Sequence, residues 1–196
     1  MAKLFFRYGT MNSGKSTSLI QVAYNYQETG QRPFVFKPRL DTKNSKVLSR
    51  IGATLLVDHQ IETSDDLFQI IANEFSQNRA VDCVLVDEAQ FLTVSQVDQL
   101  MRITVRMEIP VIAYGLRTDF LGNAFPASQR FLEIAQNLEE IRTKCWFCKA
   151  KANFNVRQNP DGSFVKSGKQ ILIDDGTQVT YLPLCARHFD EFVGLK

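Results

Sequence analysis

The sequence predicts an α/β protein whose mostly parallel sheet is covered by helices on both faces, followed by a small β unit. Three observations indicate this fold class. Up to about residue 142, short apolar runs alternate with helical patterns. After residue 143 the helical period disappears. Two close pairs of potential metal ligands lie in that last segment. We therefore expect a larger domain over residues 1–142 and a smaller, metal-stabilised domain over residues 143–196.

Four short runs rich in Val, Ile or Phe predict the strands of the sheet. A parallel sheet is buried on both faces, so its strands are continuously apolar rather than alternating. Residues 39–54, in contrast, are polar and basic, and we predict a loop there. The four predicted strands cover residues 3–8, 34–37, 81–87 and 111–114.

Four amphipathic patterns between or after these runs predict helices. Leu19, Val22, Ala23 and Tyr26 have the spacing of one helical face, and Gly30 is placed to end that helix. The same spacing recurs over residues 67–75 after the capping sequence Ser64-Asp65-Asp66, over residues 97–104 after Ser95, and over residues 131–138.

The segment after residue 143 predicts short hairpins. Residues 152–157 alternate in polarity, Asn159-Pro160-Asp161-Gly162 has the composition of a turn, and residues 163–166 follow it. Residues 170–173 and 178–184 predict a second hairpin. A unit this small buries little apolar surface, so we expect a metal ion to hold it together.

Composition and charge exclude several classes of protein. The chain has 196 residues, 44% of them hydrophobic, with 15 Phe, which is enough to fill a core and excludes a disordered chain. No apolar run approaches the roughly 20 residues of a membrane span. The 23 basic and 21 acidic residues do not cluster, so we expect no nucleic-acid partner and no membrane partner. Four Cys without an export signal favour a cytoplasmic location and metal binding over disulfides.

The segment Gly9-Thr10-Met11-Asn12-Ser13-Gly14-Lys15-Ser16 fits the phosphate-binding pattern G-x-x-x-x-G-K-S, between a predicted strand and a predicted helix. Its glycines allow backbone N–H groups to surround phosphate oxygens. Lys15 would contact the outer phosphates, and the Ser16 hydroxyl would bind magnesium. The motif predicts an ATP site.

A second acidic motif, Asp87-Glu88, ends an apolar strand and therefore lies at the same edge of the sheet as the phosphate loop. Asp87 would hold magnesium, and Glu88 would be a base directed at an attacking hydroxyl or water. We expect Ala89 and Gln90, which follow them, to border the ATP site as well. These motifs predict nucleoside triphosphate chemistry without specifying the acceptor.

Cys145, Cys148, Cys185 and His188 form two close pairs of ligands that suit a closed, tetrahedral, structural zinc site. The 36 residues between the pairs exceed the usual spacing of a zinc ribbon, so a larger hairpin must be held at its base. Trp146, between two of the ligands, is interpreted as a packing residue.

Together, the phosphate loop, the sequence Asp87-Glu88-Ala89-Gln90-Phe91 and the C-terminal Cys/His pairs resemble the cytosolic, zinc-containing type II thymidine kinases. The segment 114–120, Tyr-Gly-Leu-Arg-Thr-Asp-Phe, extends the resemblance, which covers nearly the whole chain. It implies a RecA-like P-loop domain and a zinc-bound lasso domain. It also implies transfer of the ATP γ-phosphate to the 5′-hydroxyl of deoxythymidine, in a homotetramer inhibited by dTTP.

The resemblance also implies roles for single residues. Glu88 matches the catalytic base, Asp41 an acidic position near the phosphates, and Tyr181 the aromatic residue of the loop that closes over the nucleoside. The predicted substrate-binding set is Met11, Asp41, Phe91, Leu116, Phe120, Phe125 and Tyr181.

Two other functions stay open at this point. The sequence Asp87-Glu88-Ala89-Gln90 also fits a helicase motif, so a helicase or translocase acting on single-stranded nucleic acid is the first alternative. The second is a zinc-ribbon binding module that uses ATP as a switch, which predicts a basic, aromatic-rich face.

Overall fold

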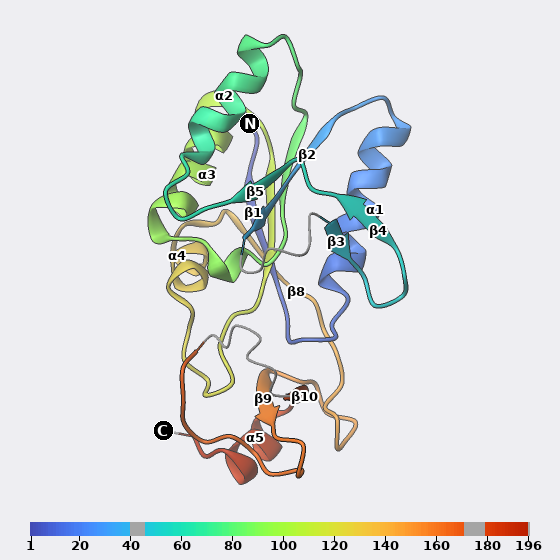
Figure 1. The fold of residues 1–196 in the computed structure, drawn as a ribbon, viewed down its shortest axis with the longest axis vertical. Helices are drawn as coiled ribbons and strands as arrows, with labels where there is room; N and C mark the ends of the chain where they lie inside the picture. The colour runs from blue at the N-terminus through green and yellow to red at the C-terminus, as the bar shows by residue number, and fades with distance from the viewer. Residues whose placement is uncertain (40–45, 171–178, 196) are drawn as a thin grey trace.

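The computed structural model describes residues 1–39, 46–170 and 179–195, and its central feature is a six-stranded sheet (Figure 1). The strand order is β5-β2-β6-β7-β1-β8, and every neighbouring pair is parallel. The predicted parallel α/β fold is therefore confirmed. The strands are β1 (Leu4–Tyr8), β2 (Pro33–Pro38), β5 (His59–Ile61), β6 (Cys83–Val86), β7 (Val111–Gly115) and β8 (Asn137–Glu140).

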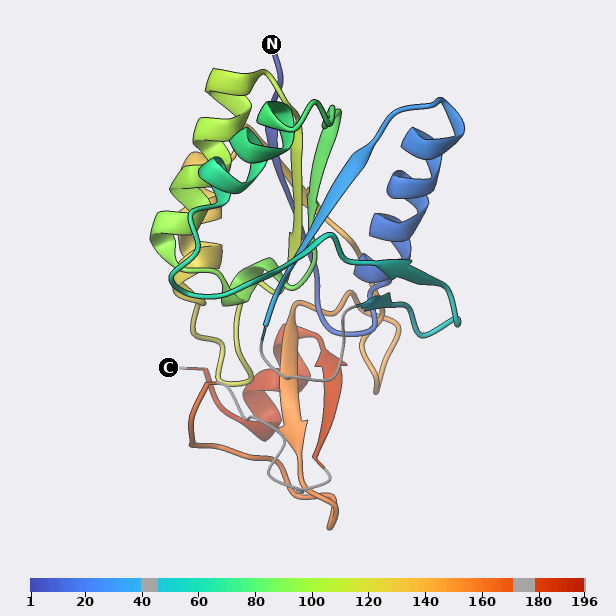
Figure 2. The ribbon, with the colours of Figure 1, turned by 45° about the horizontal axis from the view of Figure 1, so that its top comes forward.

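Helices cover both faces of the sheet. The helices α2 (Leu67–Ser76), α3 (Val94–Met107) and α4 (Pro126–Ile134) lie on one face, and α1 (Lys15–Glu28) lies on the other (Figures 1 and 2). The hydrophobic core around the sheet is therefore divided into two clusters, one on each face of the sheet. Successive side chains of β6 alternate between them: Val84 and Val86 pack with the three helices, and Cys83 and Leu85 pack with α1. No helix of the described residues is long and apolar enough to cross a membrane.

Local capping sets where two of the helices begin. The Asp66 side chain accepts a hydrogen bond from the Gln69 backbone N–H, which confirms the predicted cap of α2. Helix α3 begins one turn earlier than its apolar pattern, because Thr93 and Gln96 form a capping box.

The prediction of one helix through residue 138 is wrong. Helix α4 ends at Ile134, and residues Asn137–Glu140 form β8, which pairs with β1. The Gln136 N–H donates to the Leu4 carbonyl and the Gln136 side chain accepts from the Leu4 N–H, which begins that pairing. Leu138 is 46% exposed. Its spacing fits the helical period, but it is not part of the buried face of a helix.

The prediction of an unstructured loop over residues 39–54 also needs correction. Strands β3 (Lys46–Leu48) and β4 (Thr54–Leu56) form an antiparallel hairpin on the α1 side of the sheet (Figure 2). Val47 is its fully buried side chain, packed in the same cluster as Leu19 of α1. Because the hairpin has only one fully buried side chain, its sequence shows no alternation of apolar and polar residues, and no strand was predicted there. Residues 40–45 lie outside the described part of the chain.

The C-terminal unit is built on an antiparallel pair, β9 (Phe154–Gln158) and β10 (Thr180–Leu184), followed by the short helix α5 (Ala186–Phe192). The predicted turn at residues 159–162 is present, since the Gly162 N–H donates to the Asn159 carbonyl. Its predicted partner strand is reduced to one bridge between Gln158 and Phe164, and β9 pairs with β10 instead. Of the second predicted hairpin, residues 171–178 lie outside the described residues.

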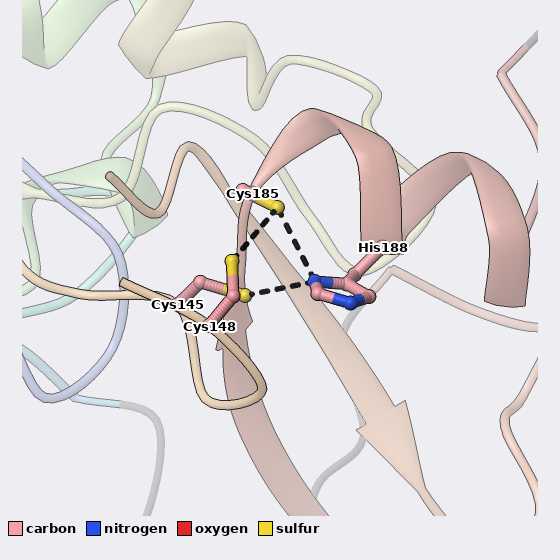
Figure 3. A group of neighbouring side chains, drawn as sticks. All are labelled: Cys145, Cys148, Cys185 and His188. Carbon is pink, nitrogen blue, oxygen red and sulfur yellow. Dashed lines mark hydrogen bonds between the residues drawn. The ribbon is translucent and has the colours of Figure 1, made fainter. Parts of the chain in front are cut away.

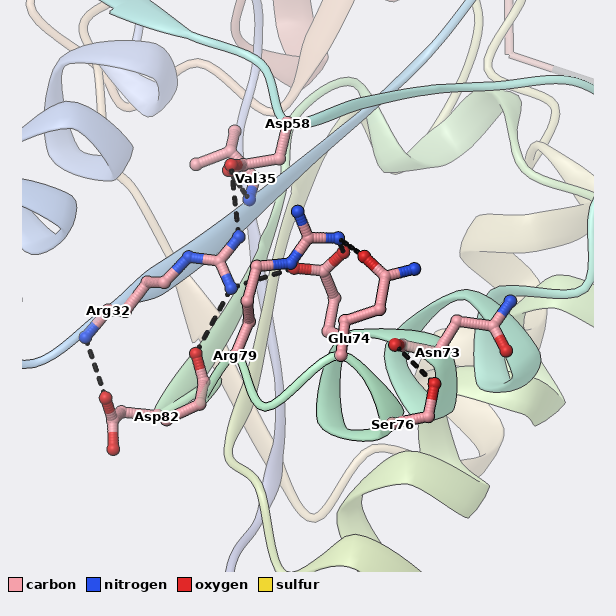
Figure 4. A network of polar contacts seen from close by, with 10 residues as sticks. Arg32, Val35, Asp58, Asn73, Glu74, Ser76, Arg79 and Asp82 are labelled. Atoms are coloured by element: carbon pink, nitrogen blue, oxygen red, sulfur yellow. Dashed lines mark hydrogen bonds and ion pairs between the residues drawn. The ribbon is translucent and has the colours of Figure 1, made fainter.

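A polar network at the edge of the sheet away from the phosphate loop joins β2 to α2 (Figure 4). Glu74, on the last turn of α2, lies between two guanidinium groups, 2.9 Å from Arg32 and 2.7 Å from Arg79. Arg32 also lies 3.8 Å from Asp58, and its backbone N–H donates to Asp82. Burial raises the pKa of Asp58, although its hydrogen bond from the Val35 N–H and the charge of Arg32 oppose this.

Replacing Glu74 with Ala should lower the free energy of unfolding by about 1 kcal/mol, because it removes the buried carboxylate between the half-buried Arg32 and the more exposed Arg79. Urea unfolding at neutral pH measures this loss. Glu133→Ala is the matched control, since Glu133 pairs with Arg130 on an exposed helix surface and should change stability by less than about 0.5 kcal/mol. Equal effects of the two substitutions would contradict a stabilising role for the network.

Candidate active site

The phosphate loop has the predicted strand–loop–helix context, running from the end of β1 to the start of α1. A Cβ at Gly9 would lie 2.6 Å from both the Ile141 carbonyl and Ser13 Oγ, so a larger residue does not fit. Gly14 has φ +85°, a conformation that L side chains disfavour. Both glycines are therefore required by the geometry of the loop.

Several groups of the loop are placed for an anion. Lys15 Nζ donates to the Thr10 and Gly9 carbonyls at 2.8 and 3.3 Å, folded over its own loop. Burial lowers the pKa of Lys15, while the nearby Glu88 and Asp87 raise it. Thr10 Oγ1 and Ser13 Oγ are buried without a hydrogen-bond partner among the described residues. Unpaired buried hydroxyls beside a desolvated ammonium fit a phosphate-binding site.

The acidic pair lies at the end of β6, next to this loop. Asp87 is buried, and Ser16 Oγ donates to its Oδ1 at 3.4 Å. Burial, and then the neighbouring Glu88 charge, raise the pKa of Asp87, while Lys37 and Lys15 oppose this. A desolvated carboxylate that bonds a serine hydroxyl is a suitable pair of oxygen ligands for Mg²⁺. The residues therefore fit the magnesium site that the motif predicts.

Glu88 has an unusual backbone and a fixed side chain. Its φ of +50° lies in the left-handed region, which is strained for this residue type and is found most often at functional sites. Gln90 Nε2 donates to Glu88 Oε2 at 2.6 Å, and Gln90 Oε1 accepts from the Leu116 N–H at 3.0 Å. The buried Gln90 thus holds the Glu88 carboxylate against the end of β7.

A first cavity at this edge of the sheet lies along the phosphate loop and has a volume of about 370 Å³. Glu88 lines it, and so do residues of the turn between β3 and β4, including Ser49 and Arg50. The charge of Arg50 also lowers the pKa of Lys15, so two cations converge on this cleft. Sequence analysis missed these two residues because the β3–β4 segment was interpreted as a loop.

The second cavity, of about 170 Å³, collects most of the residues predicted to bind the acceptor. Six of the seven line it together, and the seventh, Asp41, lies outside the described residues. Tyr181 comes from β10 of the C-terminal unit, so the cavity is formed between that unit and the sheet. Sequence analysis missed four polar lining residues. The six predicted residues that line the cavity are Met11, Phe91, Leu116, Phe120, Phe125 and Tyr181. The four polar lining residues that were not predicted are Thr118, Asp119, Asn155 and Gln170.

Met11 connects the two cavities, because it lines both. Its backbone N–H donates to Asn155 Oδ1 at 2.7 Å, although the two residues are 144 positions apart. Asn155 lies on β9 and is buried. The C-terminal unit is therefore bonded directly to the phosphate loop.

The predicted zinc ligands meet in one cluster (Figure 3). The ligand atoms of Cys145, Cys148, Cys185 and His188 lie within 4.8 Å of one another. Cys148 Sγ and Cys185 Sγ are 3.8 Å apart, and His188 Nδ1 is 3.3 Å from Cys145 Sγ and 3.4 Å from Cys185 Sγ. A tetrahedron with Zn–S bonds of ~2.3 Å has edges of about 3.8 Å, so the spacing fits zinc.

The environment of the cluster favours metal-binding thiolates. Burial raises the pKa of Cys145, but hydrogen bonds from the backbone of Cys185, Phe147 and Cys148 and from His188 outweigh it and lower that pKa. The packing interpretation of Trp146 is wrong for this chain, because that side chain is 62% exposed. Its backbone N–H donates to the Pro183 carbonyl, which connects the metal-binding turn to β10.

Comparison with known proteins identifies the family. A family model described as thymidine kinase matches residues 2–189. Thymidine kinases of Rhodopirellula baltica and Legionella pneumophila are 44% and 45% identical, covering 98% and 96% of this chain and 90% of their own. That of Colwellia psychrerythraea is 42% identical over the whole of both chains.

Among solved structures, replication initiator DnaA bound to AMPPCP and single-stranded DNA has a TM-score of 0.41 at 18% identity. It covers 72% of this chain and 41% of its own, a likeness too low to support any inference. The family match, in contrast, covers nearly the whole chain and agrees with relatives above 40% identity. This chain belongs to the thymidine kinase family.

Proposed function

We propose that this chain transfers the γ-phosphate of ATP to the 5′-hydroxyl of deoxythymidine, giving dTMP. The observation that carries the proposal is the junction of two cavities at Met11. One cavity is bordered by a phosphate loop and the other is lined by four aromatic and four polar residues besides Met11 and Leu116, as sites for a nucleotide donor and a pyrimidine acceptor would be. Glu88 lines the first cavity and Phe91, three residues later, lines the second.

On the donor side, the backbone of the phosphate loop and Lys15 would hold the phosphates of ATP. Ser16 and Asp87 would hold Mg²⁺, which supplies charge neutralisation on the transferred phosphoryl group when it is bound. Ala89 and Gln90, both predicted to border this site, are buried and do not line the cleft, so Gln90 would act on it through its hydrogen bond to Glu88. Arg50 adds a second cation facing the loop.

On the acceptor side, Glu88 would accept a hydrogen bond from the 5′-hydroxyl and align it with the γ-phosphorus. Because phosphoryl transfer passes through a loose transition state, most of the rate gain comes from position and charge rather than from strong base catalysis. The strained backbone of Glu88 and its bond to Gln90 support this assignment, since both fix the carboxylate before the substrate arrives.

The remaining assignments complete the proposal. Residues 1–142 would act as the P-loop domain and residues 143–196 as the zinc-bound lasso domain. Zinc would be structural, because all four tetrahedral positions are taken by side chains. A homotetramer, feedback inhibition by dTTP and a cytoplasmic location follow from the resemblance to type II thymidine kinases.

The two alternatives have less support. A helicase or translocase needs paired RecA-like cores or a ring, and the family relationship does not favour it. A zinc-ribbon nucleic-acid module predicts a continuous basic face, whereas the basic residues of the C-terminal unit are scattered along the sequence and two of them are engaged elsewhere. Lys151 pairs with Glu140 of β8, and Arg157 is buried.

The zinc assignment predicts one zinc ion per chain. Cys145→Ser and Cys185→Ser should fold poorly rather than show a clean kinetic defect, because metal binding stabilises a unit with a small core. Elemental analysis and thermal unfolding measure this. Cys83→Ala is the control: this buried thiol lies in β6 and its loss should leave the zinc content unchanged. Active protein without zinc would disprove a structural role.

Because the site is divided into two cavities, we expect that replacing an aromatic residue of the second cavity changes KM for one substrate and not for the other. Tyr181→Ala and Phe120→Ala should each raise KM for deoxythymidine and leave KM for ATP nearly unchanged. The reason is that both side chains line the second cavity and neither lines the phosphate cleft. Steady-state kinetics with each substrate varied in turn provides the test, and an equal loss for both substrates would indicate a purely structural role.

Glu88→Gln should lower kcat for dTMP formation by on the order of 10²–10⁴ while leaving both substrates bound, because it removes the charge but keeps the volume. Asp87→Asn should differ, with a defect that raised Mg²⁺ partly relieves. The measurements are steady-state kcat and calorimetric Kd values for ATP and deoxythymidine. A near-normal kcat in Glu88→Gln, or loss of substrate binding, would assign this residue another role.

A further inference from the structure

Arg157 is a buried cation in the C-terminal unit that the proposed mechanism does not use. It lies on β9, is 2% exposed, and takes part in no ion pair among the described residues. A desolvated guanidinium is costly, so the contacts that hold it in place are informative.

Those contacts are mainly with two aromatic side chains. The guanidinium carbon lies 3.8 Å from the centroid of the Phe120 ring and 5.4 Å from that of Tyr181. Arg157 Nε donates to the Tyr181 hydroxyl at 2.9 Å, and its Nη2 donates to the Lys169 carbonyl at 3.3 Å. Arginine suits this position because its planar fork stacks on a ring and donates in fixed directions.

The two rings come from distant segments. Tyr181 lies directly opposite Arg157 in the β9–β10 pair, so the two are cross-strand neighbours. Phe120 belongs to the loop after β7, in the part of the chain that carries the sheet. Gly168 completes the arrangement, since a Cβ there would lie 3.9 Å from both Arg157 Nη1 and the Phe120 ring. Arg157 therefore joins the β9–β10 pair to the loop after β7.

Phe120 and Tyr181 line the second cavity, whereas Arg157 does not. We propose that Arg157 is a positioning residue for the nucleoside: it fixes the planes of Phe120 and Tyr181, and through them the width of the slot that receives the pyrimidine. With one face of Phe120 covered by the guanidinium, the other face or the edge is presented to the cavity. This inference rests on the proposed function, because it assigns the second cavity to the nucleoside.

Two variants of the full chain test the inference. Arg157→Met removes the charge and the hydrogen bonds but keeps an unbranched side chain, and Arg157→Lys keeps the charge without the planar fork. Both should raise KM for deoxythymidine roughly tenfold, with KM for ATP changed less than about twofold, because only the nucleoside walls are displaced. Lys166→Met, at an exposed position of the same unit, is the control and should change neither KM.

A double-mutant cycle with Tyr181→Phe gives a second readout. If Arg157 acts through Tyr181, the two substitutions should not add. The double variant Arg157→Met/Tyr181→Phe should then have a calorimetric Kd for deoxythymidine no higher than that of the single variant that binds more weakly. Additive losses, an unchanged KM for deoxythymidine, or an equal rise in both KM values would overturn the inference, as would failure of both Arg157 variants to fold. A wild-type protein that makes no dTMP would instead refute the proposed function.

Discussion

The hydrogen bond from the Met11 N–H to Asn155 Oδ1 is the contact on which the arrangement of the site depends. Met11 belongs to the phosphate loop and lines both cavities, whereas Asn155 belongs to β9. The bond is 2.7 Å long and its Asn155 end is buried, so losing it would leave the Asn155 side chain unpaired. Strand β9 pairs with β10, which leads directly into Cys185 of the metal cluster. The Cys/His cluster and the phosphate loop are thus connected through two strands.

This connection explains how a small unit can complete a site whose charged groups belong to the sheet. The six-stranded sheet provides the charged groups at the ends of β1 and β6, where Lys15, Ser16 and Asp87 meet. The C-terminal unit adds an aromatic wall through Tyr181, held by Arg157. Under the proposed function, charge neutralisation would come from one part of the chain and acceptor positioning from both, which suits a reaction in which position and charge supply most of the rate gain.

The features that could be predicted from the sequence are those that depend on residues a few positions apart. The phosphate loop, the Asp87-Glu88 strand end and the four metal ligands are each set by residue types a few positions apart, and the structure brings each set together. Sequence analysis did not predict β8, whose pairing with β1 depends on residues 132 positions apart, or the β3–β4 hairpin, which has one buried side chain. Asn155 and Arg157 were missed for the same reason, since their partners, Met11, Phe120 and Tyr181, are distant in the chain.

Under the proposed function, the phosphoryl group of ATP passes to the nucleoside and not to water. The most direct measurement follows the label from γ-labelled ATP while ADP, dTMP and inorganic phosphate are quantified, with deoxythymidine or single-stranded DNA added separately. For a thymidine kinase we expect label in dTMP, equal amounts of ADP and dTMP, and no stimulation by DNA. Release of labelled phosphate without dTMP, increased by single-stranded DNA, would contradict the proposed function and favour the helicase or translocase alternative.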